Sequence, residues 1–227
     1  MASSKNIWHG LVAVVIVAAA MLSPVTMASA RDNGQPQDGQ GKYGQLTAQW
    51  WQWILEQPAT GNPNLDSTGA DAGNGQPPKD VFFLAGTFGP DPVTRTFTVP
   101  ADTALFLPLL NNLGLAPKPA PQPKPNGNQV PQLKALAAPF VDSATGLNVT
   151  LDGVSLLGSV TRVMSPVFHF TTPAQDGLLG PGTFTGTAVS DGYWLFLGPL
   201  PPGTYELKFG GTSQGFTVDI TDNITVQ

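Results

Sequence analysis

The stretch "DGYWLFLGPLPPGTYELKFGG", residues 191–211, is the part of this chain that most directly predicts its fold class. Two apolar, aromatic-rich runs flank a turn built from glycine and proline, an arrangement common in two-sheet sandwiches. In the first run, Tyr193 and Leu195 share one face of a strand, and Trp194 and Phe196 share the other. One face must belong to a core, and the other is either covered by a helix or exposed.

Similar apolar runs continue through the last 80 or so residues, and three more precede them at Val81–Phe88, Val93–Val99 and Ala104–Leu110. The sequence has 26 glycines and 23 prolines, many of them in the turns between these runs. Strands at this spacing favour a sandwich or barrel over a parallel α/β sheet. We therefore predict a mainly β protein, a two-sheet β-sandwich of Ig-like or jelly-roll-like kind, with one short N-terminal amphipathic helix packed on it.

The predicted helix covers Leu46–Glu56 and includes three tryptophans within four positions. Its apolar residues recur at helical spacing, namely Leu46, Trp50, Trp53 and Ile54. Trp51 lies roughly 100° from Trp50 on the helical wheel, at the edge of this stripe. Trp50 and Trp53 should therefore pack against a sheet, whereas Trp51 is a candidate for function.

The N-terminal region has the pattern of a secretory signal peptide. An apolar run of 12 residues, Leu11–Leu22, is too short to span a bilayer, and Ala28-Ser29-Ala30 is a small-residue cleavage site. We expect residues 1–30 to be removed by cleavage after Ala30, which would place the protein in the periplasm or outside the cell. No transmembrane segment is expected in the remaining chain.

The rest of the chain is predicted to form one domain, residues 46–227, preceded by a tail. Residues 31–45 are polar and rich in glycine, so the tail is expected to be disordered. Residues 114–132 carry many prolines and are expected to form a loop in extended polyproline II conformation.

Charge and cysteine content exclude several classes of function. The net charge is −5 at pH 7, which argues against nucleic acid as a partner because phosphates require clustered Lys and Arg. The absence of cysteine excludes thiol catalysis, iron–sulfur clusters and cysteine-ligated zinc. No cofactor is expected apart from a structural calcium ion, for which Asp66, Asp71 and Asn74 are the candidate oxygen ligands. Turn formation is the alternative role of these three residues.

Two apparent catalytic motifs lack the necessary context. Gly211–Gly215 reads G-x-S-x-G, but strand-like runs flank it on both sides, so a hairpin turn is predicted in place of a nucleophile elbow. His169 is flanked by two phenylalanines on a predicted strand and should point outward from the core.

Aromatic side chains beside polar ones offer a more plausible binding surface. Exposed Trp and Tyr stack on sugars or peptides, with Asp, Asn and Arg forming hydrogen bonds around them. The candidate ligand-binding residues are Trp51, Arg95, Asp191 and Tyr193. Arg95 falls on the apolar side of its predicted strand and needs a partner if it is buried. The alternative is that all the aromatic residues serve packing.

The chain resembles a family of uncharacterised exported bacterial proteins. The resemblance rests on "AQWWQWIL", "NPNLDSTGAD", "FFLAGTFG", "VTRTFTVPADTALFLPLLN", "DGYWLFLGPLPPGTYELKFGG" and "DITDNITV", which together span most of residues 48–226. Relatives often carry a cysteine pair at the places held here by Ala72 and Phe97. The resemblance thus implies export, and implies that the "GADAG" loop lies against the strand containing Phe97.

These observations lead to two expectations about function. The first is an exported, non-catalytic binding or envelope-associated protein whose ligand is a glycan or a protein. The alternative is a carbohydrate-active enzyme, either a glycoside hydrolase or a polysaccharide lyase, using residues such as Tyr193, His169 and Asp191 for proton transfer.

Overall fold

The computed structural model describes residues 37–77, 80–119 and 129–227, and the predicted signal peptide lies outside these ranges. The described chain forms two five-stranded sheets and two α-helices, which confirms the predicted mainly β sandwich. The first sheet contains β1 (Val81–Phe83), β3 (Ala104–Pro119), β8 (Phe184–Leu197), β6 (Thr161–Met164) and β7 (Phe168–Thr171). The second contains β2 (Val93–Val99), β10 (Phe216–Val226), β9 (Gly203–Ser213), β4 (Thr145–Leu151) and β5 (Val154–Ser155). The helices are α1 (Gln37–Leu55) and α2 (Gln129–Asp142), and a short 3-10 helix, η1, covers Leu157–Ser159.

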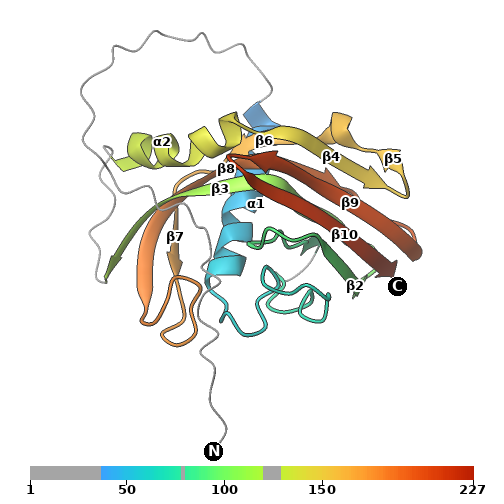
Figure 1. Ribbon diagram of the computed structural model, residues 1–227, viewed down its shortest axis with the longest axis horizontal. Coiled ribbons are helices and arrows are strands. Elements are labelled where there is room, and N and C mark those ends of the chain that lie inside the picture. Colours follow the sequence, from blue (N-terminus) through green and yellow to red (C-terminus); the bar gives the residue numbers. More distant parts are fainter. Residues whose placement is uncertain (1–36, 78–79, 120–128) are drawn as a thin grey trace, which may run out of the picture.

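The first sheet is covered on both faces, so the molecule has two apolar cores. The inner core lies between the two sheets and includes Leu107, Leu195 and Phe209. The outer core lies between the first sheet and α1 and includes Trp50 and Trp194. Figure 1 shows α1 and α2 on opposite sides of β3 and β8.

The segment 191–211 passes from one sheet to the other. β8 ends at Leu197 in the first sheet, and β9 begins at Gly203 in the second. Trp194 faces α1, with its ring centroid 5.5 Å from that of Trp50, whereas Leu195 faces the inner core. The alternation seen in the sequence therefore divides these side chains between the two cores.

Each sheet contains one parallel pair of strands. β1 pairs with β3 in parallel, and β2 pairs with β10 in parallel, whereas the remaining pairs are antiparallel. Both sheets are therefore mixed, which distinguishes them from the antiparallel sheets of Ig and jelly-roll sandwiches. β1 has only three residues and covers β3 only over Ala104–Phe106.

The prediction of a disordered tail over residues 31–45 is wrong for its second half, because α1 begins at Gln37. Tertiary contacts offset the low helix propensity of the glycines in this segment. The ring centroid of Tyr43 lies 5.7 Å from that of Phe196, and Gly44 fits closely against Pro166. Residues 31–36 lie outside the described ranges. No helix in the described ranges is long and apolar enough to span a bilayer.

The prediction of a proline-rich loop over residues 114–132 is also wrong at both ends. β3 continues to Pro119, pairing with β8, and α2 begins at Gln129. On the side away from β8, β3 has no described neighbour apart from the short β1. A backbone N–H on that side would have no neighbouring strand to donate to, so prolines, which lack the N–H, are tolerated there. Residues 120–128 are not among the described residues.

Candidate functional site

The candidate site is a cavity of about 320 Å³ along the open edge of β3. Beyond Phe106, no described strand pairs with β3 on the side away from β8. Each residue from Pro108 to Leu113 borders the cavity. Because successive side chains of a strand point to opposite faces, a cavity that touches them all lies beside the strand, at its backbone edge.

The cavity has an apolar wall on each side of the sheet. The wall next to α1 consists of Trp51, Leu55, Phe88, Leu178 and Leu179. The wall on the inner-core side consists of Leu109, Leu110, Phe140, Phe216 and Val218. At about 320 Å³, the volume is at the low end of the range for small-ligand pockets.

A β-bulge shapes the strand where the cavity begins. Pro108 lies opposite Trp194 and Leu110 lies opposite Tyr193, so Leu109 is an extra residue in β3. Bulges bend the strand and are frequent beside functional sites. Proline is suited to this edge position because it has no N–H to leave unpaired.

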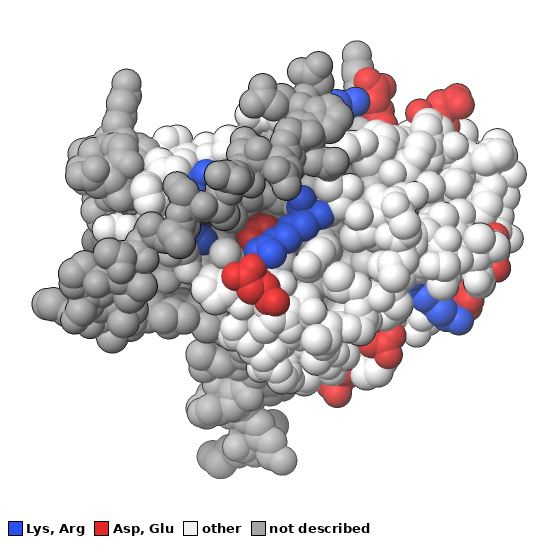
Figure 2. Space-filling model, turned by 90° about the horizontal axis from the view of Figure 1, so that it is seen from above, with Lys and Arg blue, Asp and Glu red and all other residues white. Residues whose placement is uncertain are grey.

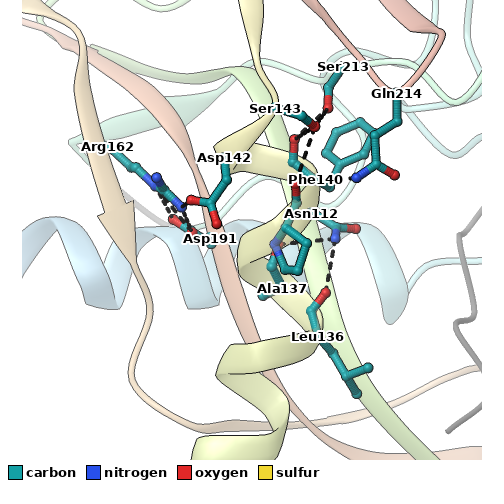
Figure 3. Close-up of polar contacts among 11 residues, drawn as sticks. Asn112, Leu136, Ala137, Phe140, Asp142, Ser143, Arg162, Asp191, Ser213 and Gln214 are labelled. Atoms are coloured by element: carbon teal, nitrogen blue, oxygen red, sulfur yellow. Dashed lines mark hydrogen bonds and ion pairs between the residues drawn. The ribbon is translucent and has the colours of Figure 1, made fainter. Parts of the chain in front are cut away.

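A clasp between α2 and the β9–β10 turn holds the inner-core wall. The clasp consists of Ser143, Ser213 and Gln214 with the backbone carbonyls of Pro139 and Phe140 (Figure 3). Ser213 Oγ lies 2.8 Å from Ser143 Oγ and donates to the Phe140 carbonyl, and Gln214 Nε2 donates to the Pro139 carbonyl at 3.2 Å.

α2 packs closely on β3. An ideal Cβ built on Gly114 would lie 1.9 Å from the Leu133 carbonyl oxygen, so only glycine allows this approach. Asn112 Nδ2 donates to the Ala137 carbonyl at 3.2 Å. Pro139 lies inside α2 and has no N–H to donate to the backbone carbonyl one turn earlier. Side-chain donors near Pro139 form hydrogen bonds with backbone carbonyls of the helix.

Three residues that border the cavity have buried polar atoms without a hydrogen-bond partner among the described residues. These atoms are Trp51 Nε1, Asn64 Oδ1 and Asn111 Nδ2. Trp51 is 6% exposed and Asn64 is 3% exposed. Leaving such a group unpaired costs roughly 1–3 kcal/mol, so each is expected to have a role. A ligand in the cavity could supply the missing acceptors and donor.

Contacts with neighbouring backbone fix the positions of Asn64 and Asn111. Asn62 Nδ2 donates to the Ile54 carbonyl near the end of α1, and Asn62 Oδ1 accepts from the backbone N–H of Asn64. Asn111 lies opposite Gly192, where an ideal Cβ would approach the Asn111 Cβ to 2.6 Å. The glycine therefore provides the space that Asn111 occupies.

None of the described residues that border the cavity carries an ionisable side chain. Polar groups come only from Thr87, Gln214 and asparagines, together with Trp51 Nε1. Figure 2 shows, on the side of the molecule that it presents, a described surface that is mostly uncharged with charged side chains in small groups. The cavity is therefore suited to an uncharged ligand.

The four predicted ligand-binding residues do not form one face. Trp51 borders the cavity but is buried in the outer core, a correction to its expected place at the edge of the stripe. Arg95 lies in the second sheet, 2% exposed, and donates two hydrogen bonds to Asp222, at 2.7 and 3.1 Å. Its partner is therefore a carboxylate within the protein.

Asp191 and Tyr193 share a face of β8, but they are not among the residues that border the cavity. Asp191 is 1% exposed and accepts a 2.6 Å hydrogen bond from Arg162. Arg162 also donates to Asp142 at the end of α2 (Figure 3). The Asp191 carboxylate raises the pKa of Arg162 further above its ordinary value. Through Asp142 and Asp191, Arg162 links β6 to α2 and β8.

The proposed calcium ligands form hydrogen bonds within their own loop. Asp66 accepts from the Thr68 hydroxyl and the Asp71 N–H at 2.7 and 2.9 Å, and Asn74 Nδ2 donates to Asp71 Oδ1 at 3.1 Å. Partial burial opposes ionisation of Asp66, but these donors outweigh it and lower its pKa. Among the described residues, no three His, Cys, Asp or Glu side chains gather in one place.

The two apparent catalytic motifs have structural roles. Gln214 and Gly215, within the G-x-S-x-G segment, form a two-residue hairpin turn at positive φ, as the flanking strands predicted. His169 is exposed, as predicted, and its Nδ1 lies 3.2 Å from the Thr187 hydroxyl.

No family model, curated protein or solved structure matches this chain. Asn64 and Asn111 were missed at the sequence level because asparagine is an ordinary turn residue, and its burial beside a cavity depends on distant segments. The repeated asparagine in "LPLLNNLGL" was the one available signal, since asparagine is depleted in strands.

Proposed function

We propose that this chain is an exported, non-catalytic binding protein whose ligand, a glycan or a protein, occupies the cavity beside β3. The observation that carries the proposal is that three residues lining an apolar cavity carry buried polar atoms with no hydrogen-bond partner among the described residues. Apolar walls with a few convergent polar groups are typical of ligand sites. The signal-peptide pattern of residues 1–30 supports the export part of the proposal.

A carbohydrate-active enzyme has no supporting geometry in this cavity. Glycoside hydrolysis ordinarily requires two carboxyl groups flanking the bond, and no carboxylate is among the described residues that border the cavity. His169 lies opposite Thr187, four residues along β8 from Asp191, a separation of roughly 13 Å. His169 and Asp191 therefore lie at well-separated backbone positions, and neither is among the residues that border the cavity.

The proposal can be tested by thermal unfolding of the purified exported protein with a panel of envelope glycan fragments and short uncharged peptides. A ligand that binds the native state raises Tm by mass action. At least one member of the panel should raise the Tm of the wild type but not that of Thr87→Trp, which places a large ring in the cavity wall. Leu179→Trp, from another part of the wall, should give the same result.

Thr204→Trp is the matched control, because Thr204 is exposed on β9 and does not border the cavity. This variant should respond to the ligand as the wild type does. The proposal is wrong if no panel member changes the Tm of the wild type, or if both occluding variants respond fully.

A further inference from the structure

The open edge of β3 offers a ligand more than side-chain contacts. An edge strand presents outward-directed backbone N–H and C=O groups that can pair with another chain. The cavity touches β3 at consecutive positions from Pro108 to Leu113, and again at Leu115. Its position beside the edge makes these backbone groups part of the binding surface.

The residues of this part of the edge do not themselves oppose strand pairing. Proteins commonly block open edges with proline or with charged side chains. The segment Leu109–Ala116 contains neither, although Pro108 and Pro117 lie at its two ends. Pairing is therefore permitted over a short window, and the flanking prolines restrict its extent.

The two apolar walls match the geometry of an added strand. Alternate side chains of such a strand would point to opposite faces of the first sheet. One set would meet the wall containing Trp51 and Leu55, and the other would meet the wall containing Phe140 and Val218. A segment that fits both walls therefore has apolar side chains at consecutive positions. An alternation of apolar and polar side chains would place polar groups against one of the walls.

The unpartnered polar atoms favour amides over sugars. Trp51 Nε1 and Asn111 Nδ2 are donors, and Asn64 Oδ1 is an acceptor. A peptide group offers one carbonyl and one N–H, which satisfies both kinds of atom. A sugar brings several hydroxyl groups, and apolar walls would leave most of them unpaired at a cost of roughly 1–3 kcal/mol each.

We propose that the ligand is an uncharged, apolar segment of another polypeptide, which binds in extended conformation as an added strand along the free edge of β3. This inference rests on the proposed function and specifies its ligand. Backbone hydrogen bonds would supply affinity, and the two walls would select the side chains. The absence of ionisable groups among the described lining residues selects against a charged segment.

The test uses a short capped peptide of valine, phenylalanine and threonine and two backbone-methylated forms of it. In an added strand, alternate N–H groups face the edge and the others face away. Methyl groups on one alternate set should weaken binding by about tenfold or more, and methyl groups on the other set should leave it nearly unchanged. Isothermal titration of the full exported protein measures the three dissociation constants.

Replacing a central valine of the peptide by aspartate should abolish binding, and the Thr87→Trp protein should bind none of the peptides. Equal weakening by both methylation patterns would overturn the inference, because binding would not use strand pairing. Binding of a glycan but of no peptide would overturn it and leave the proposed function intact. A dimer that the peptide does not displace from β3 would assign the edge to a second copy, and would also overturn it.

Discussion

The guanidinium of Arg95, a predicted ligand-binding residue, is paired with Asp222 inside the protein. Both side chains are nearly inaccessible, and Arg95 also donates to the Ala85 carbonyl at 2.7 Å. Burial raises the pKa of Asp222, and the Arg95 guanidinium opposes this effect. The sequence correctly indicated that a buried Arg95 would need a partner, but Asp222 is distant in the chain and the pairing depends on the register of β2 with β10.

Arg95→Met should destabilise the protein by about 3–5 kcal/mol at neutral pH, because it leaves the Asp222 carboxylate buried and unpaired. The loss should be measured by chemical denaturation. The double variant Arg95→Met with Asp222→Leu should recover much of the stability, since no buried charge remains. A double variant as unstable as the single one would contradict this account.

The same single variant should show a characteristic pH dependence. Without Arg95, the folded-state pKa of Asp222 rises further above its unfolded value, so the folded state binds the proton more tightly. Stability relative to the wild type should therefore improve as pH falls through the raised pKa towards about 4. A destabilisation that is unchanged across this window would show that Asp222 does not titrate as proposed.

At the scale of elements, contacts between segments distant in the sequence determine where α1 begins and where β3 ends, which the local sequence pattern did not predict. The helical spacing of the tryptophans predicted the second half of α1, whereas its first half depends on contacts of Tyr43 and Gly44. The prolines after Gly114 indicated a loop, yet they lie in an edge strand where a missing N–H is tolerated. The edge of β3 is open because β1 is short, and nothing in the sequence indicated how short β1 would be.

The close approach of α2 to β3 predicts the effect of a single methyl group. Gly114→Ala should destabilise the protein by about 1–3 kcal/mol, because its Cβ would collide with backbone atoms of α2. Gly158→Ala is the matched control, since a Cβ there meets nothing within 4 Å. Differential scanning calorimetry should show a lower Tm only for the first variant, and equal Tm values would contradict the packing described here.

The loop around Ala72 lies against β2, as the resemblance implied. The Thr96 N–H donates to the Thr68 carbonyl at 2.9 Å, and Ala72 and Phe97 border the same small cavity. A protein carrying Ala72→Cys and Phe97→Cys should form a disulfide that stabilises it by about 3 kcal/mol, or roughly 6–12 °C in Tm, over its own reduced form. Free thiols under oxidising conditions would contradict this proximity.

At the scale of the whole molecule, the sequence predicted the sandwich, and the structure located the candidate site. The alternation in residues 193–196 follows from burial on both faces of β8, so the class of fold could be predicted. The cavity could not, because it is formed where α1, β3, α2 and the β9–β10 turn meet. Of the predicted ligand-binding residues, only Trp51 borders it.

Hydrogen exchange of the β3 amides tests the central claim most directly. In the free protein, the outward-directed N–H groups between Leu109 and Leu115 should exchange rapidly, because no described strand pairs with them. Saturation with the capped peptide should slow exchange at alternate residues of this segment by about tenfold or more. Bound peptide that leaves every β3 amide unchanged, or that protects amides elsewhere instead, would contradict the account.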